Sequence, residues 1–213
     1  IQVTTPSLGV VRERKTAVNP VNGNVIAISA KNNNDWATTK MDYDEYGNLI
    51  YIEYPETSAS QSMYYKYKYD TVCNKYVIHI SDAFGYQSKA TYNYWFDKIE
   101  STTDKTGNKM LYKYDLFGRN TIIIAPKEIA AGIKYTIKFE YFPYFSLLPS
   151  GSGVSFDAVN PSNSTFVPVA VTSHYDQQNP SNDIQTFSFI DGLARPIQVK
   201  KDIYYNKGTA NQP

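Results

Sequence analysis

The chain has 213 residues, enough to bury a core, and its 21 basic and 20 acidic residues leave a formal net charge of +1. A nucleic-acid-binding protein normally carries a basic excess, because neutralisation of phosphates dominates its affinity, so this balance argues against nucleic acid as a partner. No apolar run approaches the roughly 20 residues of a membrane-spanning helix, which predicts a soluble chain. The chain starts at Ile1 without a basic and then apolar leader, and we expect it to be a piece of a longer protein.

The aromatic content is dominated by tyrosine, with 20 Tyr against 10 Phe and 2 Trp. A tyrosine ring buries apolar area while its hydroxyl reaches water, which suits a sheet that is half packed and half wet. The single cysteine, Cys73, rules out an internal disulfide and a cysteine-based zinc cluster. Residues that favour helices are scarce over any long window, so the composition predicts an all-β chain.

Alternation with a period of two recurs along the chain and predicts half-buried strands. Tyrosines alternate with lysines over residues 65–69, and similar patterns cover 90–94 and 135–141. Residues 48–54 and 121–125 are apolar on both faces, which is typical of central strands. The best candidate for a turn of helix is 127–134, although Gly132 weakens it.

A recurring turn separates these strands. An Asp opens it, a Gly follows three residues later, and Asn or Arg often comes next. The carboxylate can accept from nearby backbone N–H groups, and glycine supplies the positive φ that closes the reversal. We expect an aromatic third residue (Tyr46, Phe84 or Phe117) to fold over the hairpin. The predicted turn residues are Asp44 and Gly47, Asp82 and Gly85, Asp104 and Gly107, Asp115 and Gly118, and Asp191, with a variant at residues 19–24.

These turns form an internal repeat of hairpins, each too small to bury its own face, so neighbours must stack into one sheet. The units Tyr43-Asp44-Glu-Tyr-Gly47-Asn48 and Tyr114-Asp115-Leu-Phe-Gly118-Arg119 resemble the YD-repeat, or RHS-repeat, family. Residues 189–198, with Asp191 and Arg195, are similar to a DGLGR unit of the B-type subunits of insecticidal toxin complexes, except that Ala194 replaces the second glycine. The resemblance covers about residues 17–125 and 184–202.

The resemblance implies an array of antiparallel β-hairpins in an extended, twisted sheet that forms part of a hollow shell. The implied partners are the remaining repeats of the same parent chain and an enclosed C-terminal toxin domain. The implied location is secreted or on a bacterial cell surface. The self-cleaving Asp-Pro-x-Gly region of the shell proteins has no match here, so cleavage would lie outside this sequence.

We expect three parts in one continuous unit: a hairpin array over 1–141, an irregular insertion rich in Pro, Ser and Asn over 142–183, and a further hairpin with a tail over 184–213. The insertion holds a glycine-rich stretch, 150–153, that reads as a flexible loop because it lacks the spacing of a nucleophile elbow.

Catalytic interpretations are weak. His79 and His174, the only histidines, lack the partner spacing of a metal-binding helix. The turn aspartates could resemble an acid–base or calcium set, but equivalent turn positions should spread them along the sheet, and a weak calcium site between loops stays open. We expect no catalytic residue, resident metal or cofactor.

Two functions remain. The first is a non-catalytic structural segment of a toxin-enclosing shell, and the second is a surface or wall-associated module that binds carbohydrate or a protein. Exposed tyrosines with Trp36 or Trp95 would stack on sugars in the second case. Open sheet edges would also let isolated copies pair, so we expect association as concentration rises.

Overall fold

The computed structural model describes residues 2–4, 11–32, 35–57, 60–142, 168–191, 193 and 195–201. They form an all-β chain of antiparallel hairpins, as predicted. The chain divides into two compact units, Ile1–Lys109 and Met110–Pro213. In the described part of the chain no helix has the length and apolarity needed to cross a membrane.

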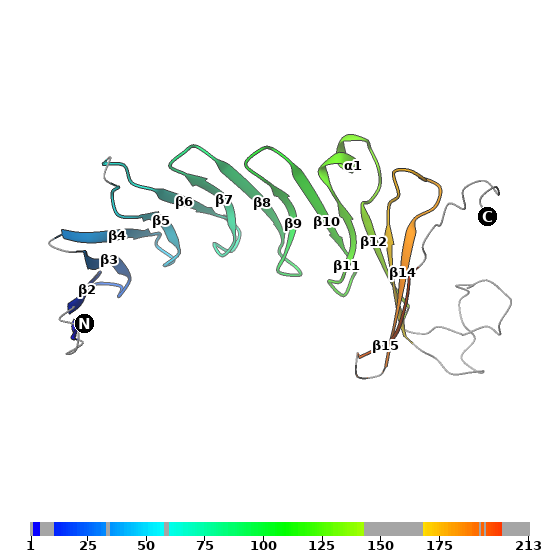
Figure 1. Ribbon diagram of the computed structural model, residues 1–213, viewed down its shortest axis with the longest axis horizontal. Coiled ribbons are helices and arrows are strands. Elements are labelled where there is room, and N and C mark those ends of the chain that lie inside the picture. Colours follow the sequence, from blue (N-terminus) through cyan, green and yellow to red (C-terminus); the bar gives the residue numbers. More distant parts are fainter. Residues whose placement is uncertain are drawn as a thin grey trace, which may run out of the picture. The chain divides into compact units, whose positions relative to one another are not determined.

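The first unit is an antiparallel meander of nine strands (Figure 1). Its strands are β1 (Gln2–Thr4), β2 (Val11–Val18), β3 (Val25–Asn32), β4 (Asp35–Tyr43), β5 (Leu49–Glu53), β6 (Tyr64–Tyr69), β7 (Val77–Asp82), β8 (Gln87–Asn93) and β9 (Lys98–Thr103). Successive connections therefore lie alternately at the two opposite ends of the strands. Each of these two rows of connections is called an edge of the unit. The turns after β2, β4, β6 and β8 share one edge, and the connections after β3, β5 and β7 share the other.

The second unit continues the same pattern with β10 (Lys109–Tyr114), β11 (Asn120–Ile124), β12 (Ile137–Phe142), β13 (Val169–His174), β14 (Ile184–Ile190) and β15 (Pro196–Lys201). A short helix, α1 (Pro126–Ala130), lies between β11 and β12. Proline at its first position has no N–H to lose, and Gly132 follows its end at φ +69°. The predicted helical turn is therefore confirmed, and Gly132 ends the helix.

Strand faces follow the sequence pattern. In β6 the lysines Lys66 and Lys68 are exposed, whereas Tyr65 and Tyr67 are half-buried. In β5 all five residues are half-buried, as expected for a strand with apolar residues on both faces. The alternation predicted over 135–141 begins as strand only at Ile137, since Tyr135 and Thr136 belong to the connection from α1.

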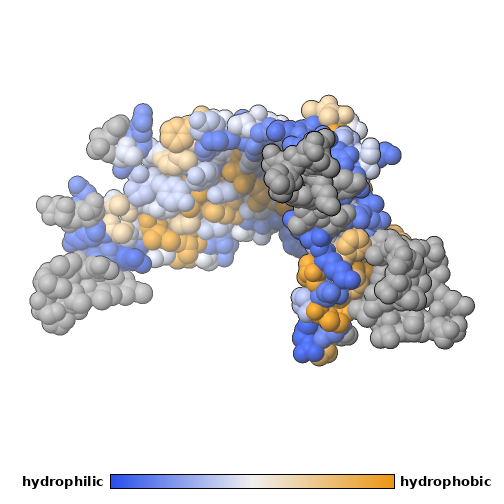
Figure 2. All heavy atoms as spheres, turned by 45° about the vertical axis from the view of Figure 1, so that its right-hand side comes forward, coloured by the Kyte–Doolittle hydropathy of each residue, from blue (hydrophilic) through white to orange (hydrophobic). Residues whose placement is uncertain are grey.

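Apolar burial is sparse. Among the described residues the buried apolar side chains are Met41, Ile124, Val169, Val171 and Phe189. The last three form one cluster in the second unit, on strands β13 and β14. Figure 2 shows apolar residues in patches among hydrophilic ones on the face in view. Much of the order must therefore come from strand pairing and from the turns.

Part of the predicted insertion is regular structure, because β13 pairs with both β12 and β14. Residues 143–167, which include the glycine-rich stretch, and the tail 202–213 lie outside the described residues.

Candidate functional site

The recurring turn is built around one side-chain oxygen of its first residue. In the turn after β4, Asp44 Oδ1 accepts from the backbone N–H of Tyr46 at 3.0 Å and of Asn48 at 2.8 Å. The Gly47 N–H donates to the Asp44 carbonyl at 3.1 Å, and the Asp44 N–H donates to the Asn48 carbonyl at 3.0 Å. One aspartate thus satisfies most of the polar backbone groups of a five-residue reversal.

The same hydrogen bonds recur at the other predicted turns, with Oδ1 of the aspartate accepting from the second and fourth residues after it. The aspartates are Asp82, Asp104, Asp115 and Asp191. The described turn glycines all have positive φ: Gly47 at +84°, Gly85 at +80°, Gly107 at +86° and Gly118 at +73°. Ala194, which stands at the glycine position of the turn at Asp191, lies outside the described residues.

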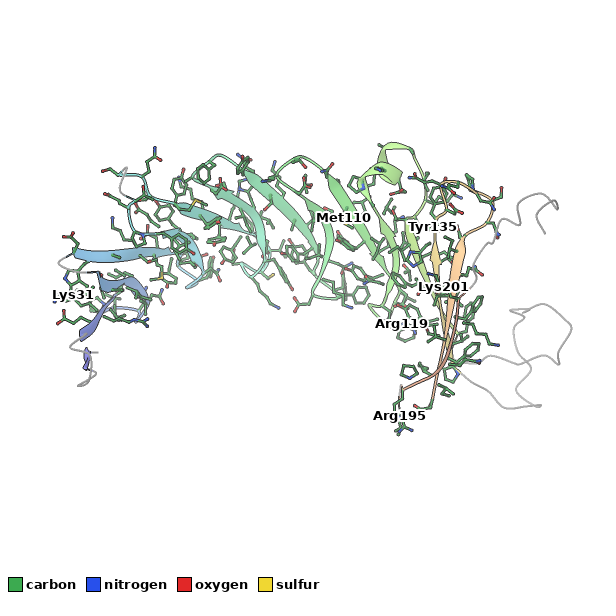
Figure 3. All side chains as sticks on the ribbon, viewed as in Figure 1. Lys31, Met110, Arg119, Tyr135, Arg195 and Lys201 are labelled. Atoms are coloured by element: carbon green, nitrogen blue, oxygen red, sulfur yellow. The ribbon has the colours of Figure 1, made fainter. Side chains whose placement is uncertain are left out.

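The residue after the glycine explains the Asn or Arg of the sequence pattern. Asn48 Nδ2 donates to Asp44 Oδ2 at 3.0 Å, and Asn108 does the same to Asp104 at 3.1 Å. Arg119 and Arg195, labelled in Figure 3, instead donate from Nε to Oδ2 of Asp115 and Asp191, both at 2.7 Å. In these four turns the second carboxylate oxygen is also occupied.

These contacts keep the turn carboxylates charged. Side-chain hydrogen bonds from Thr106 and Asn108 lower the pKa of Asp104 to about 2. Burial acts to raise the pKa of Asp44, but hydrogen bonds from Asn48 and Tyr46 outweigh it and the pKa falls. A carboxylate held this way is a poor general acid or base near neutral pH.

Two further turns have no glycine and were missed in the sequence. Asp70 accepts from four backbone N–H groups, those of Val72 (3.0 Å), Cys73 (2.7 Å), Lys75 (2.9 Å) and Tyr76 (2.8 Å). It is 2% exposed, and these bonds outweigh the effect of burial and lower its pKa to about 2. The available signal was the Tyr69-Asp70 pair, which repeats Tyr43-Asp44.

In the second missed turn, Asn93 Oδ1 accepts from Trp95 N at 3.0 Å and Phe96 N at 3.2 Å. Left-handed backbone is supplied by Asn74 (φ +54°) in the first of these turns and by Asp97 (φ +59°) in the second. Asn and Asp tolerate this conformation, so a search for glycine alone overlooks both turns.

Tyrosines tie neighbouring strands together close to these turns. Tyr43 Oη donates to the Val25 carbonyl at 3.0 Å and Tyr69 Oη to the Leu49 carbonyl at 3.2 Å. Each acceptor is the first residue of the preceding strand, beside a turn. Tyr92 and Tyr141 repeat the contact with Val77 (3.2 Å) and Asn120 (2.9 Å).

At six of the described turns the strand pairing shifts register at the residue immediately before the Asp or Asn that opens the turn. In the first unit this residue is Val18, Tyr43, Tyr69 or Tyr92, and in the second it is Tyr114 or Ile190. Such a bulge locally bends and twists a strand. The Tyr-Asp pair therefore couples a bulge and an inter-strand hydrogen bond to a turn.

The expectation that Tyr46, Phe84 and Phe117 fold over their hairpins is wrong. Their side chains are 62%, 74% and 82% exposed. Their backbone N–H groups bond to the turn aspartates, and this places the side chains at the outer tips of the turns.

The predicted aspartates do not converge. Asp44 follows β4 and Asp82 is the last residue of β7, so the two lie at opposite edges of the first unit, while Asp115 and Asp191 follow β10 and β14 of the second. Within the described ranges, no group of three or more His, Cys, Asp or Glu side chains is placed to hold a metal. His79, on β7, contacts Gln87 at 3.2 Å, and His174 lies exposed at the end of β13.

Lysine ammonium groups lie over several of the aromatic rings on the strand faces. Lys15 Nζ lies 3.9 Å from the centre of the Trp36 ring, and Lys66 Nζ lies 5.2 Å from that of Tyr64. Tyr51 and Tyr64 pack on each other at 5.6 Å. A sugar stacking on these ring faces would have to displace the ammonium groups.

No family model matches the chain, and no curated protein matches it. Among solved structures, it is similar to a chain of "TcdB2-TccC3-Cdc42", with a TM-score of 0.55 and 14% identity over 88% of this chain. The chain has the fold of a segment of TcdB2-TccC3. A chain of "TcdB2-TccC3-TEV" is also found, at 13% identity over 90% of this chain and a TM-score of 0.32.

This likeness confirms the predicted fold class, an array of antiparallel hairpins in an extended sheet. The chain spans 12% and 13% of the lengths of the two matched chains. At this level of identity the match carries fold and no shared activity.

Proposed function

We propose that the chain is a non-catalytic structural segment of a larger RHS/YD-repeat protein, and that it builds part of the wall of a β-shell around a toxin domain. The observation that carries the proposal is the use of the turn carboxylates. In Asp44, Asp104, Asp115 and Asp191 both oxygens are occupied by groups of the same turn. The groups most able to perform chemistry are thereby committed to making hairpins.

The fold match supports the same role, because it relates most of this chain to a small part of a much longer chain. A wall of consecutive hairpins needs reliable reversals and ties between neighbours, which the Asx turns and the tyrosine hydroxyls provide. The proposed partners are further repeats of the parent chain and an enclosed C-terminal domain. The proposed location is outside the bacterial cytoplasm, secreted or on the cell surface.

The test is the intact mass of the full-length parent protein, measured before and after denaturing chromatography. We expect a self-released C-terminal fragment that stays with the shell under native conditions and separates when the shell is denatured. A single uncleaved chain that leaves no domain protected from protease would contradict enclosure and favour a surface-binding role.

A further inference from the structure

The third residue of the Asx turn is apolar more often than the turn requires. At ten described positions a backbone N–H donates to the side-chain oxygen of the Asp or Asn two residues before it, which makes the donor the third residue of an Asx turn. Seven of the ten third residues are large and apolar, and the other three are Asn24, Thr106 and Gln178. All seven apolar ones are exposed: Val21 (92%), Tyr46 (62%), Val72 (69%), Phe84 (74%), Trp95 (93%), Phe117 (82%) and Leu193 (75%).

The turn that opens at Asp104 shows that the apolar side chain is not needed to form the reversal. Thr106 makes the same backbone bond to Asp104, at 2.8 Å, and its hydroxyl adds another at 2.7 Å. A polar residue therefore serves the turn at least as well. Turn tips are normally polar, so the apolar residues at seven of the tips call for a contact outside the turn.

Four of these residues lie on one edge of the first unit. Val21, Tyr46, Val72 and Trp95 occupy the turns after β2, β4, β6 and β8, and in a meander such alternate turns share an edge (Figure 1). Successive turns are two strands apart, so the tips repeat at about 10 Å. We call these four residues the tip row. Phe84 lies on the opposite edge.

We propose that the tip row is a self-association surface whose occupant is the hairpin edge of a second copy of this chain. A second array of the same hairpins has the same repeat of about 10 Å, so its tips can lie between those of the first over the whole row. Charge does not oppose this contact, since the formal net charge is +1 and Lys75, beside the row, is paired with Asp97 at 2.7 Å.

The size of the row sets the strength of the contact. A fully buried aromatic contributes about 150–250 Å², so the exposed parts of Trp95 and Tyr46 with the two valines offer on the order of 400–500 Å² per copy. A stable interface buries about 800 Å² per partner. Copies of the isolated chain should therefore associate weakly and reversibly, and a longer array would associate more tightly.

The test compares a triple variant, Tyr46→Thr/Val72→Thr/Trp95→Thr, with Phe84→Thr. Threonine copies the residue that the chain itself uses at position 106, so the backbone bond of each turn is kept. Sedimentation velocity of the full chain from micromolar to millimolar concentration measures association. We expect wild type and Phe84→Thr to associate alike and the triple variant to associate at least about tenfold more weakly, the effect of losing roughly 1.4 kcal/mol.

Equal association of the triple variant and wild type would overturn the proposal and assign self-association to open strand edges such as β15, whose six residues are all exposed. A wild type that stays monomeric at millimolar concentration would overturn it as well. Tip-row-dependent pelleting of wild type with phosphatidylcholine–phosphatidylglycerol vesicles, without self-association, would replace the second copy by a membrane surface.

A second measurement is independent of how well the triple variant folds. In a Trp36→Phe variant, Trp95 is the remaining tryptophan, and its fluorescence reports on the row. We expect iodide quenching of Trp95 to fall as concentration rises. Quenching that is unchanged while the chain associates would place the contact elsewhere and refute the proposal.

Discussion

Replacing Asp70 by Asn tests whether the number of carboxylate oxygens in use sets the stability of a turn. Asp70 uses both: Oδ1 accepts from Val72 and Cys73, and Oδ2 accepts from Lys75 and Tyr76. An amide keeps one acceptor and turns an NH₂ group toward two N–H donors. The matched control is Asp82→Asn, because the bonds found for Asp82 are both to Oδ1.

The chain itself shows that an amide suffices where one oxygen is used. Asn19 Oδ1 accepts from Val21 N at 2.9 Å, and Asn93 Oδ1 caps its turn in the same way. Asp82→Asn should therefore cost less than about 1 kcal/mol. In Asp70→Asn two donors at a residue that is 2% exposed lose their acceptor, and at about 1–3 kcal/mol for each we expect a loss of roughly 2–6 kcal/mol.

The pH dependence gives a second magnitude. The pKa of Asp70 falls from 3.8 to about 2 on folding, which corresponds to about 2 kcal/mol. Because the folded pKa is the lower one, this stabilisation is complete above the unfolded pKa of 3.8 and is lost as the pH falls through about 2. The difference between wild type and Asp70→Asn should therefore be full at pH 6 and shrink at lower pH.

Urea unfolding followed by tryptophan fluorescence is the assay, since Trp36 and Trp95 both lie in the first unit with Asp70 and Asp82. Equal losses for the two variants would refute the reasoning from oxygen count. So would a loss in Asp70→Asn that does not change between pH 6 and pH 3.

Three other variants test the remaining parts of the repeat. Gly47→Ala should lower the free energy of unfolding in urea by about 1–2 kcal/mol through backbone strain alone, because nothing lies within 4 Å of the added methyl at φ +84°. Gly47→Asn should lower it less, and equal losses would contradict this reasoning. Tyr69→Phe removes the bond to the Leu49 carbonyl and should cost about 0.5–1.5 kcal/mol, with faster amide exchange in β5 and β6, and no such loss would argue against the inter-strand tie. Glu128→Gln disturbs a buried carboxylate that accepts from Thr136 at 2.9 Å and Gln177 at 3.2 Å, so thermal unfolding followed by circular dichroism should show a loss of about 1–3 kcal/mol, and an unchanged transition would exclude this role.

The alternating pattern of the sequence and its Asp–Gly spacing determined much of this structure. Period-two alternation needs nothing beyond the chain to assign a strand, and an aspartate three residues before a glycine encodes a reversal within five residues. That is why the hairpins around Asp44, Asp104 and Asp115 could be predicted. The turns at Asp70 and Asn93 escaped because Asn74 and Asp97 adopt the left-handed conformation that was sought only at glycines.

Only the tertiary structure decided which contacts form between hairpins and in which direction the tip residues point. The tie from Tyr69 to Leu49 spans 20 residues and depends on strand register, which a bulge shifts at Tyr69. The sequence predicted that Tyr46, Phe84 and Phe117 would cover their hairpins, but the Asx bond to their own N–H groups directs them outward. Local chemistry encodes each hairpin, whereas the exposed surface depends on backbone geometry, which residue types alone do not specify.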